Sequence, residues 1–140
     1  MRPEAYLDVA DDLARSGGPA HLRSAVSRAY YAVYHVASEA SMRLGAPRSH
    51  SHDVIGDRFH TSEDPDISAL GQRFLNLKSA RHHADYKLYW PGDVEEPSKV
   101  AVHLREARDL VAVFSDLPTG ALRPAAEMAI GAYEERYRGR

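Results

Sequence analysis

The sequence predicts an all-α protein built as an antiparallel helical bundle. Apolar residues recur at spacings of three and four along most of the chain, and no segment shows the sustained alternation of a half-buried strand. Short segments rich in glycine and proline separate the helical stretches, and none is long enough to link two domains. The chain has 140 residues, the length of one ordinary domain, so we expect a single domain over 1–140.

Six helical segments are expected between these breaks. They are three long amphipathic helices at about 20–44, 66–89 and 97–117, and three shorter ones at about 3–15, 51–60 and 122–137. Pro3 suits the first turn of a helix, and Ser51 suits an N-cap. Long helices with short connections pack antiparallel, which favours a bundle.

Composition excludes several classes of protein. Eighteen Lys and Arg residues against twenty Asp and Glu give a net charge of −2, which argues against broad coating of nucleic acid but allows a local basic pocket. The chain has no cysteine and no histidine pair at helical i, i+4 spacing, so we expect neither a metal site nor a cofactor. Acidic residues near the start and the lack of a long apolar run predict a cytoplasmic protein without membrane contact.

The apolar pattern of the segment 66–89 breaks at Arg81. Steps of three and four along this segment reach apolar side chains, and the same steps place Arg81 on the face that turns toward the bundle. A buried arginine requires an anion, and Asp85 lies one turn later on the same face. Two interpretations follow: an ion pair that fixes helix register, or a functional pocket into which Arg81 projects.

Basic and aromatic residues alternate around this position. Residues 73–90 contain four bases and one acid, a local charge of +3, and the set is Arg73, Lys78, Arg81, Lys87 and Asp85. Tyr86, Tyr89 and Trp90 lie among them, and His82 adds charge when it is protonated. Cationic groups hold phosphate and aromatic rings stack on bases, so the mixture is typical of nucleotide or single-stranded RNA binding.

A second polar stripe runs along the segment 20–44. Arg28, Tyr31 and His35 follow one another at spacings of three and four and therefore share one helix face. His35 suits general-base chemistry near neutral pH, and it equally suits a half-buried side chain bonded to a neighbouring helix.

Three runs of residues resemble the motifs of one protein family, the prokaryotic HEPN domains. The run 27–35, SRAYYAVYH, resembles S-R-A-Y-Y-A-x-F/Y-H, and the run 81–86, RHHADY, resembles R-x-x-A-D-Y. Between them, His52 with Ile55 and Phe59 resembles H-x-x-V/I-x-x-x-F. The motifs occur in the family's order, and the match covers about 5–117.

The resemblance implies a HEPN-like bundle of four to five helices, a homodimer, and a role in defence or toxin–antitoxin systems beside a nucleotidyltransferase-type partner protein. Many members are metal-independent ribonucleases that use an arginine followed, after four to six residues, by a histidine. Arg81 matches that arginine. Positions 86–88, where the histidine is expected, hold Tyr86, Lys87 and Leu88.

Three functions therefore stay open. The first is binding of a nucleotide or single-stranded RNA, with Arg81 as phosphate clamp and a surrounding set of His82, Asp85, Tyr86, Lys87, Arg28 and Tyr31. The second is a ribonuclease toxin that uses Arg81 with His82 or His35. The third is a structural dimer without ligand. We expect a homodimer in each case, because Tyr30, Tyr31 and Tyr34 add apolar surface that one small bundle does not fully cover.

Overall fold

The computed structural model describes residues 1–137. These residues form six α-helices and one short 3-10 helix, joined by turns and loops, and they contain no strand. The elements are α1 (Ala5–Ser16), α2 (Pro19–Arg43), α3 (His52–His60), α4 (Pro65–Tyr86), η1 (Gly92–Val94), α5 (Pro97–Asp116) and α6 (Arg123–Tyr137). The all-α prediction is confirmed. The helices number six, where four to five were expected from the resemblance.

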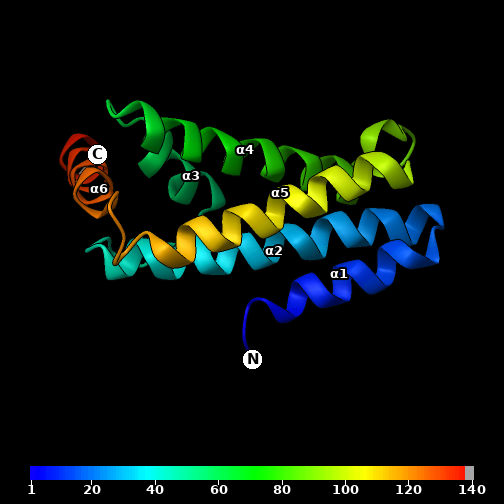
Figure 1. The fold of residues 1–140 in the computed structure, drawn as a ribbon. Coiled ribbons are helices and arrows are strands. Elements are labelled where there is room, and N and C mark those ends of the chain that lie inside the picture. Colours follow the sequence, from blue (N-terminus) through cyan, green and yellow to red (C-terminus); the bar gives the residue numbers. More distant parts are fainter. Residues whose placement is uncertain (138–140) are drawn as a thin grey trace.

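α2 is the central helix of an up-and-down arrangement (Figure 1). α1 and α4 run antiparallel to α2 on either side of it, and α5 crosses the front of the bundle beside α2. α3 lies against α4, and α6 lies across one end of the molecule, next to α3. The turn between α4 and α5 is at the other end, close to the first residues of α2.

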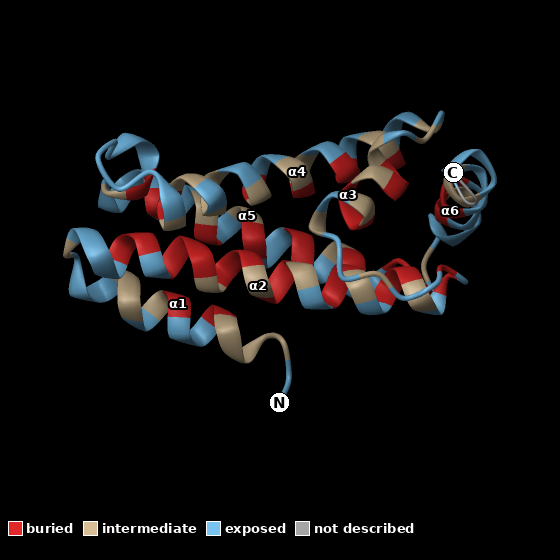
Figure 2. Cartoon of the chain, turned by 180° about the vertical axis from the view of Figure 1, so that it is seen from behind, coloured by how far each residue is buried: buried red, intermediate tan, exposed pale blue. Residues whose placement is uncertain are grey.

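α2 can occupy the centre because its buried face is formed largely by small side chains. Alanines at 25, 29, 32, 37 and 40 are buried on it, which lets α1, α4 and α5 approach its backbone closely. Figure 2 shows α2 buried along most of its length, whereas the other long helices are buried only on their inner faces. This is the pattern that amphipathic helices adopt around a central, mostly buried one.

The close packing of α3 on α4 depends on Gly71. A Cβ atom at this position would lie 2.2 Å from the backbone nitrogen of His60, so no side chain fits between the helices. α6 is joined to α3 by an ion pair of 3.1 Å between buried Arg58 and Glu134. Ser51 caps α3 as predicted, since its side chain accepts a hydrogen bond from the amide of Val54.

The sequence-based boundary of α4 was wrong by three residues. The helix ends at Tyr86 instead of Tyr89, because Lys87 leaves the helical conformation with φ −105° and ψ 61°. Pro91 bars the helix from continuing past residue 90, where its ring would meet the carbonyl of Lys87, but it does not itself end the helix at Tyr86. Leu88, which the apolar stripe placed in the core, is consequently exposed. α1 begins at Ala5, two residues after Pro3.

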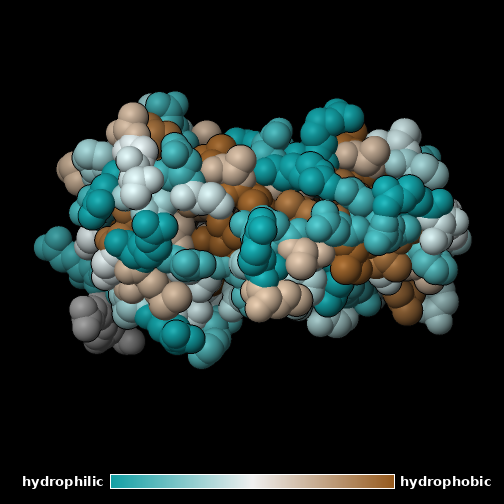
Figure 3. Space-filling model, turned by 60° about the horizontal axis from the view of Figure 1, so that its bottom comes forward, coloured by the Kyte–Doolittle hydropathy of each residue, from teal (hydrophilic) through white to brown (hydrophobic). Residues whose placement is uncertain are grey.

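The molecular surface carries both hydrophilic and hydrophobic side chains. On the face that carries α1, hydrophobic groups appear as patches among hydrophilic side chains (Figure 3). Of the helices in residues 1–137, none combines the length and the apolar character needed to span a bilayer.

Candidate functional site

The three motif runs meet in space. Side chains from α1, α2 and the start of α3 form one group of stacked and edge-on rings, which we call the aromatic cluster: Tyr6, Tyr30, Tyr31, Tyr34, His35 and His52. Arg81 on α4 lies against it. Residues as far apart in the sequence as Tyr6 and Arg81 are thus assembled into one site.

Arg81 is held between aromatic rings. Its Nη2 donates a hydrogen bond of 2.7 Å to Tyr31 Oη. Its Cζ atom lies 5.2 Å from the ring centroid of Tyr31, 5.6 Å from that of Tyr30 and 5.8 Å from that of Tyr86. These are cation–π distances. The side chain is 13% exposed, so it is neither sealed in the core nor freely solvated.

Asp85 compensates the charge of Arg81. Its Oδ2 lies 3.1 Å from Arg81 Nε and also accepts a hydrogen bond of 3.2 Å from Ser27. Burial opposes the charged form of Arg81, but the hydrogen bond to Tyr31 and the charge of Asp85 outweigh it and raise the pKa of the guanidinium. The predicted pairing of Arg81 with Asp85 is therefore present.

One donor of Arg81 is unsatisfied. Nε is buried and has no hydrogen-bond partner among residues 1–137, because the Asp85 carboxylate is close to it but out of line with the N–H bond. Unsatisfied buried donors are rare in folded proteins and call for an explanation.

His52 is the side chain that sequence reasoning missed as a site candidate. Its Nδ1 lies 2.6 Å from Tyr30 Oη, and its ring stacks on Tyr34 with a centroid separation of 4.2 Å and an interplanar angle of 17°. Nε2 has no protein partner in the part of the chain that the structure describes. The motif that contains His52 was recognised in the sequence, but the residue itself was not assigned to the site.

Charges around His52 keep it neutral. Burial lowers the pKa of the imidazole, and the positive charges of Arg81 and Lys78 lower it further. Lys78 in turn forms an ion pair of 2.7 Å with Asp53, the residue after His52. At pH 7 the ring is therefore uncharged, held in one orientation, and has one free nitrogen.

The structure brings most of the predicted site residues together. Tyr31 is shared by two guanidinium groups, because Arg28 Cζ lies 5.0 Å and Arg81 Cζ 5.2 Å from its ring centroid. His35 stacks on Tyr6 with a centroid separation of 5.9 Å and an interplanar angle of 7°. Tyr6 was not among the predicted residues, and it closes the cluster from α1.

Two predicted residues lie at or beyond the edge of the cluster. His82 is exposed, and its ring contacts that of Tyr86, with 4.9 Å between the centroids. Lys87 is the C-cap residue of α4 and its side chain is exposed. The sequence also led us to expect that one bundle would leave Tyr30, Tyr31 and Tyr34 of α2 partly uncovered. This was wrong for Tyr30, which is fully buried, whereas Tyr31 and Tyr34 are half-buried.

The aromatic cluster is partly exposed: Tyr30 is buried, His35 is exposed, and the other four rings are half-buried. Three surface cavities lie elsewhere, and none of them is lined by a residue of the cluster or by Arg81. Within residues 1–137 no group of three or more potential metal ligands is close enough to hold an ion.

Comparison of the chain with family models, curated proteins and solved structures found no match. Its function is inferred from the geometry of these side chains.

Proposed function

We propose that this chain is a HEPN-like domain that binds a phosphate-bearing ligand, a nucleotide or single-stranded RNA, through Arg81. The observation that carries the proposal is the setting of this residue. A guanidinium has five donors in a fixed fork that suits phosphate oxygens. Nη2 is bonded to Tyr31 and buried Nε lies against Asp85, so Nη1, which makes no hydrogen bond to the protein within residues 1–137, is the donor left for a ligand.

The tyrosines around Arg81 support a ligand with bases. Tyr86 is 65% exposed and contacts both Arg81 and His82. A base that stacks on this ring has its phosphate near the guanidinium, which is the pairing of stacking and charge that RNA-binding surfaces use. Arg28, whose guanidinium also contacts the Tyr31 ring, provides a second cation for the same ligand.

Binding to a labelled hexaribonucleotide tests the proposal. Wild type is expected to bind with an affinity that weakens as salt increases, and Arg81→Ala is expected to abolish binding. Arg73→Ala is the matched control, because Arg73 lies on the same helix but is paired with Glu106 on α5 at 2.6 Å. Equal binding by wild type and Arg81→Ala would contradict the proposal.

A metal-independent ribonuclease is the second candidate, and His52 is the observation that favours it. A neutral imidazole with a free Nε2 close to a phosphate-binding arginine can accept the proton of an RNA 2′-hydroxyl. The position where the resemblance implies a histidine is Tyr86, whose phenol is a weak base at neutral pH. We therefore expect binding without cleavage, and cleavage lost in both Arg81→Ala and His52→Asn would reverse this order.

The third candidate, a structural dimer, is favoured by the Arg81–Asp85 ion pair alone. It predicts that wild type binds neither nucleotide nor RNA.

The proposal that the chain acts in a toxin–antitoxin or defence system, with a nucleotidyltransferase-type partner, rests on the resemblance. Co-purification of the chain with such a partner at fixed stoichiometry tests it.

A further inference from the structure

A group of large apolar side chains is exposed directly after α4. We call residues 86–91 the aromatic loop. Within it Tyr89 is 98% exposed, Trp90 68% and Leu88 64%. Exposed apolar residues that adjoin one another mark binding sites more often than isolated ones do.

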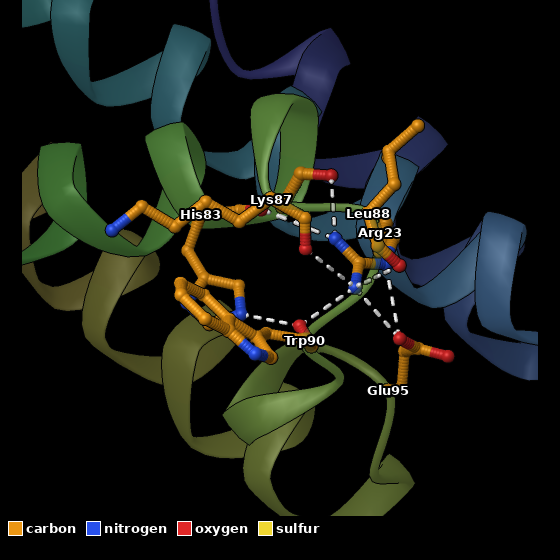
Figure 4. A network of polar contacts seen from close by, with 7 residues as sticks. Arg23, His83, Lys87, Leu88, Trp90 and Glu95 are labelled. Carbon is orange, nitrogen blue, oxygen red and sulfur yellow. Dashed lines mark hydrogen bonds and ion pairs between the residues drawn. The ribbon is translucent and has the colours of Figure 1, made fainter.

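The backbone of the aromatic loop is fixed by one buried side chain. Arg23, near the start of α2, donates from Nη2 to the carbonyl oxygens of Lys87, Leu88 and Trp90, at 3.2, 3.4 and 2.8 Å. Its Nη1 donates to the carbonyl oxygens of the last turn of α4, at residues 83 and 84. Figure 4 shows these oxygens converging on the guanidinium, which also forms an ion pair of 2.7 Å with Glu95.

Two further contacts close the loop. His83 Nε2 lies 2.6 Å from the carbonyl oxygen of Trp90 (Figure 4). Gly92 follows with φ +48°, and a Cβ atom there would lie 2.8 Å from the His83 ring. The loop thus presents its aromatic side chains from an ordered backbone, which lowers the entropy lost when they bind a ligand.

The charge near the loop favours an anionic ligand. Lys87 is the only charged residue among 86–92, and it has no ion-pair partner in the described part of the chain. The carboxylates that follow are each paired: Glu95 with Arg23, and both Asp93 and Glu96 with Lys99. Lys99 faces two carboxylates, so the residues beyond the loop add no positive charge, and the cation available at the loop itself is Lys87.

We propose that the aromatic loop is a second base-stacking platform, so that the ligand of the Arg81 site is a single-stranded oligonucleotide and not a mononucleotide. This inference rests on the proposed function. Tyr86 connects the two parts, because its ring contacts Arg81 and it is also the first residue of the loop. Bases of any sequence stack on exposed tyrosine and tryptophan rings while a cation follows the backbone, here Lys87.

Tryptophan emission, excited at a wavelength that tyrosine does not absorb, reports on this loop alone, since Trp90 is the only tryptophan of the chain. Titration with a mixed-sequence hexaribonucleotide is expected to quench Trp90 emission saturably, whereas adenosine 5′-monophosphate leaves it unchanged. Tyr89→Ala and Trp90→Ala, measured with a labelled hexamer, are each expected to bind roughly 5- to 100-fold more weakly. Arg23→Lys, which loses the planar fork, is expected to lower both Trp90 anisotropy and hexamer affinity.

Leu88→Ala is the matched control. It removes an exposed apolar side chain of the same loop that has no aromatic face, so hexamer binding is expected to stay within twofold of wild type. If Arg81→Ala abolishes hexamer binding but Tyr89→Ala and Trp90→Ala bind like wild type, the proposed function stands and the stacking platform is wrong. If wild type does not bind the hexamer, both fail. A third outcome would also overturn the inference. If Trp90 emission shifts when the protein alone is concentrated, and this shift is absent in Leu88→Ala, the loop contacts a second copy of the chain instead of RNA.

Discussion

Tyr30 and His52 are joined by a hydrogen bond of 2.6 Å between Oη and Nδ1, across 22 residues of sequence and between two helices. Tyr30 is fully buried, and burial raises the pKa of its phenol, so the hydroxyl stays protonated. The bond fixes the imidazole plane and leaves Nε2 free. The orientation of His52 toward the Arg81 site is thus set from inside the core.

Removing this hydrogen bond is expected to destabilise the fold. Tyr30→Phe keeps the ring but leaves His52 Nδ1 without a partner, which costs about 1–2 kcal/mol of unfolding free energy. Urea unfolding followed by circular dichroism measures it. Tyr89→Phe removes a hydroxyl from an exposed ring and is expected to have no effect. Equal stability of Tyr30→Phe and wild type would show that the bond contributes nothing.

Stability is expected to fall in mild acid. Burial lowers the pKa of both His52 and His103 in the folded protein, whereas in the unfolded chain each titrates near pH 6.5. Below that pH the unfolded state binds protons that the folded state does not, so the free energy of unfolding decreases as pH falls. This contribution is complete above pH 6.5 and is lost between that pH and the lowered pKa values.

Unfolding curves between pH 7.5 and 5 measure this dependence. His52→Asn and His103→Asn each remove one titrating group, and each is expected to give a shallower pH dependence than wild type. Parallel curves for wild type and both variants would show that neither imidazole is responsible.

Loss of the charge on Asp85 is expected to weaken the fold around Arg81. Asp85→Asn leaves a buried guanidinium without its anion and costs about 1–2 kcal/mol, discounted because both side chains keep some solvent contact. Glu127→Gln is the matched control: it breaks an exposed i, i+4 pair with Arg123 and is expected to cost under about 0.5 kcal/mol. If thermal unfolding shows the same loss of stability for both variants relative to wild type, the Arg81–Asp85 pair is no stronger than a surface pair.

We expect a homodimer in solution. Tyr31 and Tyr34 are half-buried, and the neighbouring His35 is exposed, so this face of α2 has uncovered aromatic surface. Light scattering at micromolar concentration is expected to give twice the chain mass of 15.6 kDa. A single species at the chain mass would contradict the expectation.

The helices could be predicted from the sequence because their apolar periodicity is a local property. Arg81 was recognised because it interrupts an apolar stripe. The end of α4 was misplaced because it depends on long-range contacts. Arg23 binds the carbonyl oxygens around that end from another helix, and nothing in the sequence near residue 23 indicates those partners.

Burial within the aromatic run was not predictable for a similar reason. Tyr30 and Tyr31 are adjacent on α2, but their side chains point about 100° apart around the helix. Tyr30 is enclosed by neighbours such as Phe74 and His52, whereas Tyr31 lies at the surface edge beside Arg28. Which of two adjacent tyrosines is enclosed depends on where α3 and α4 pack, and that placement is tertiary.

The most direct test of the central claim is an NMR titration of the Arg81 Nε–H group. In ¹⁵N-labelled protein this signal is assigned by its absence from the Arg81→Lys variant, and the Nε–H signal of Arg73 is the internal reference. We expect the Arg81 signal to shift saturably as a hexaribonucleotide is added, while that of Arg73, which is bonded to Glu106, stays in place. An Arg81 signal that does not move at millimolar oligonucleotide would contradict the assignment of Arg81 as the phosphate-binding residue.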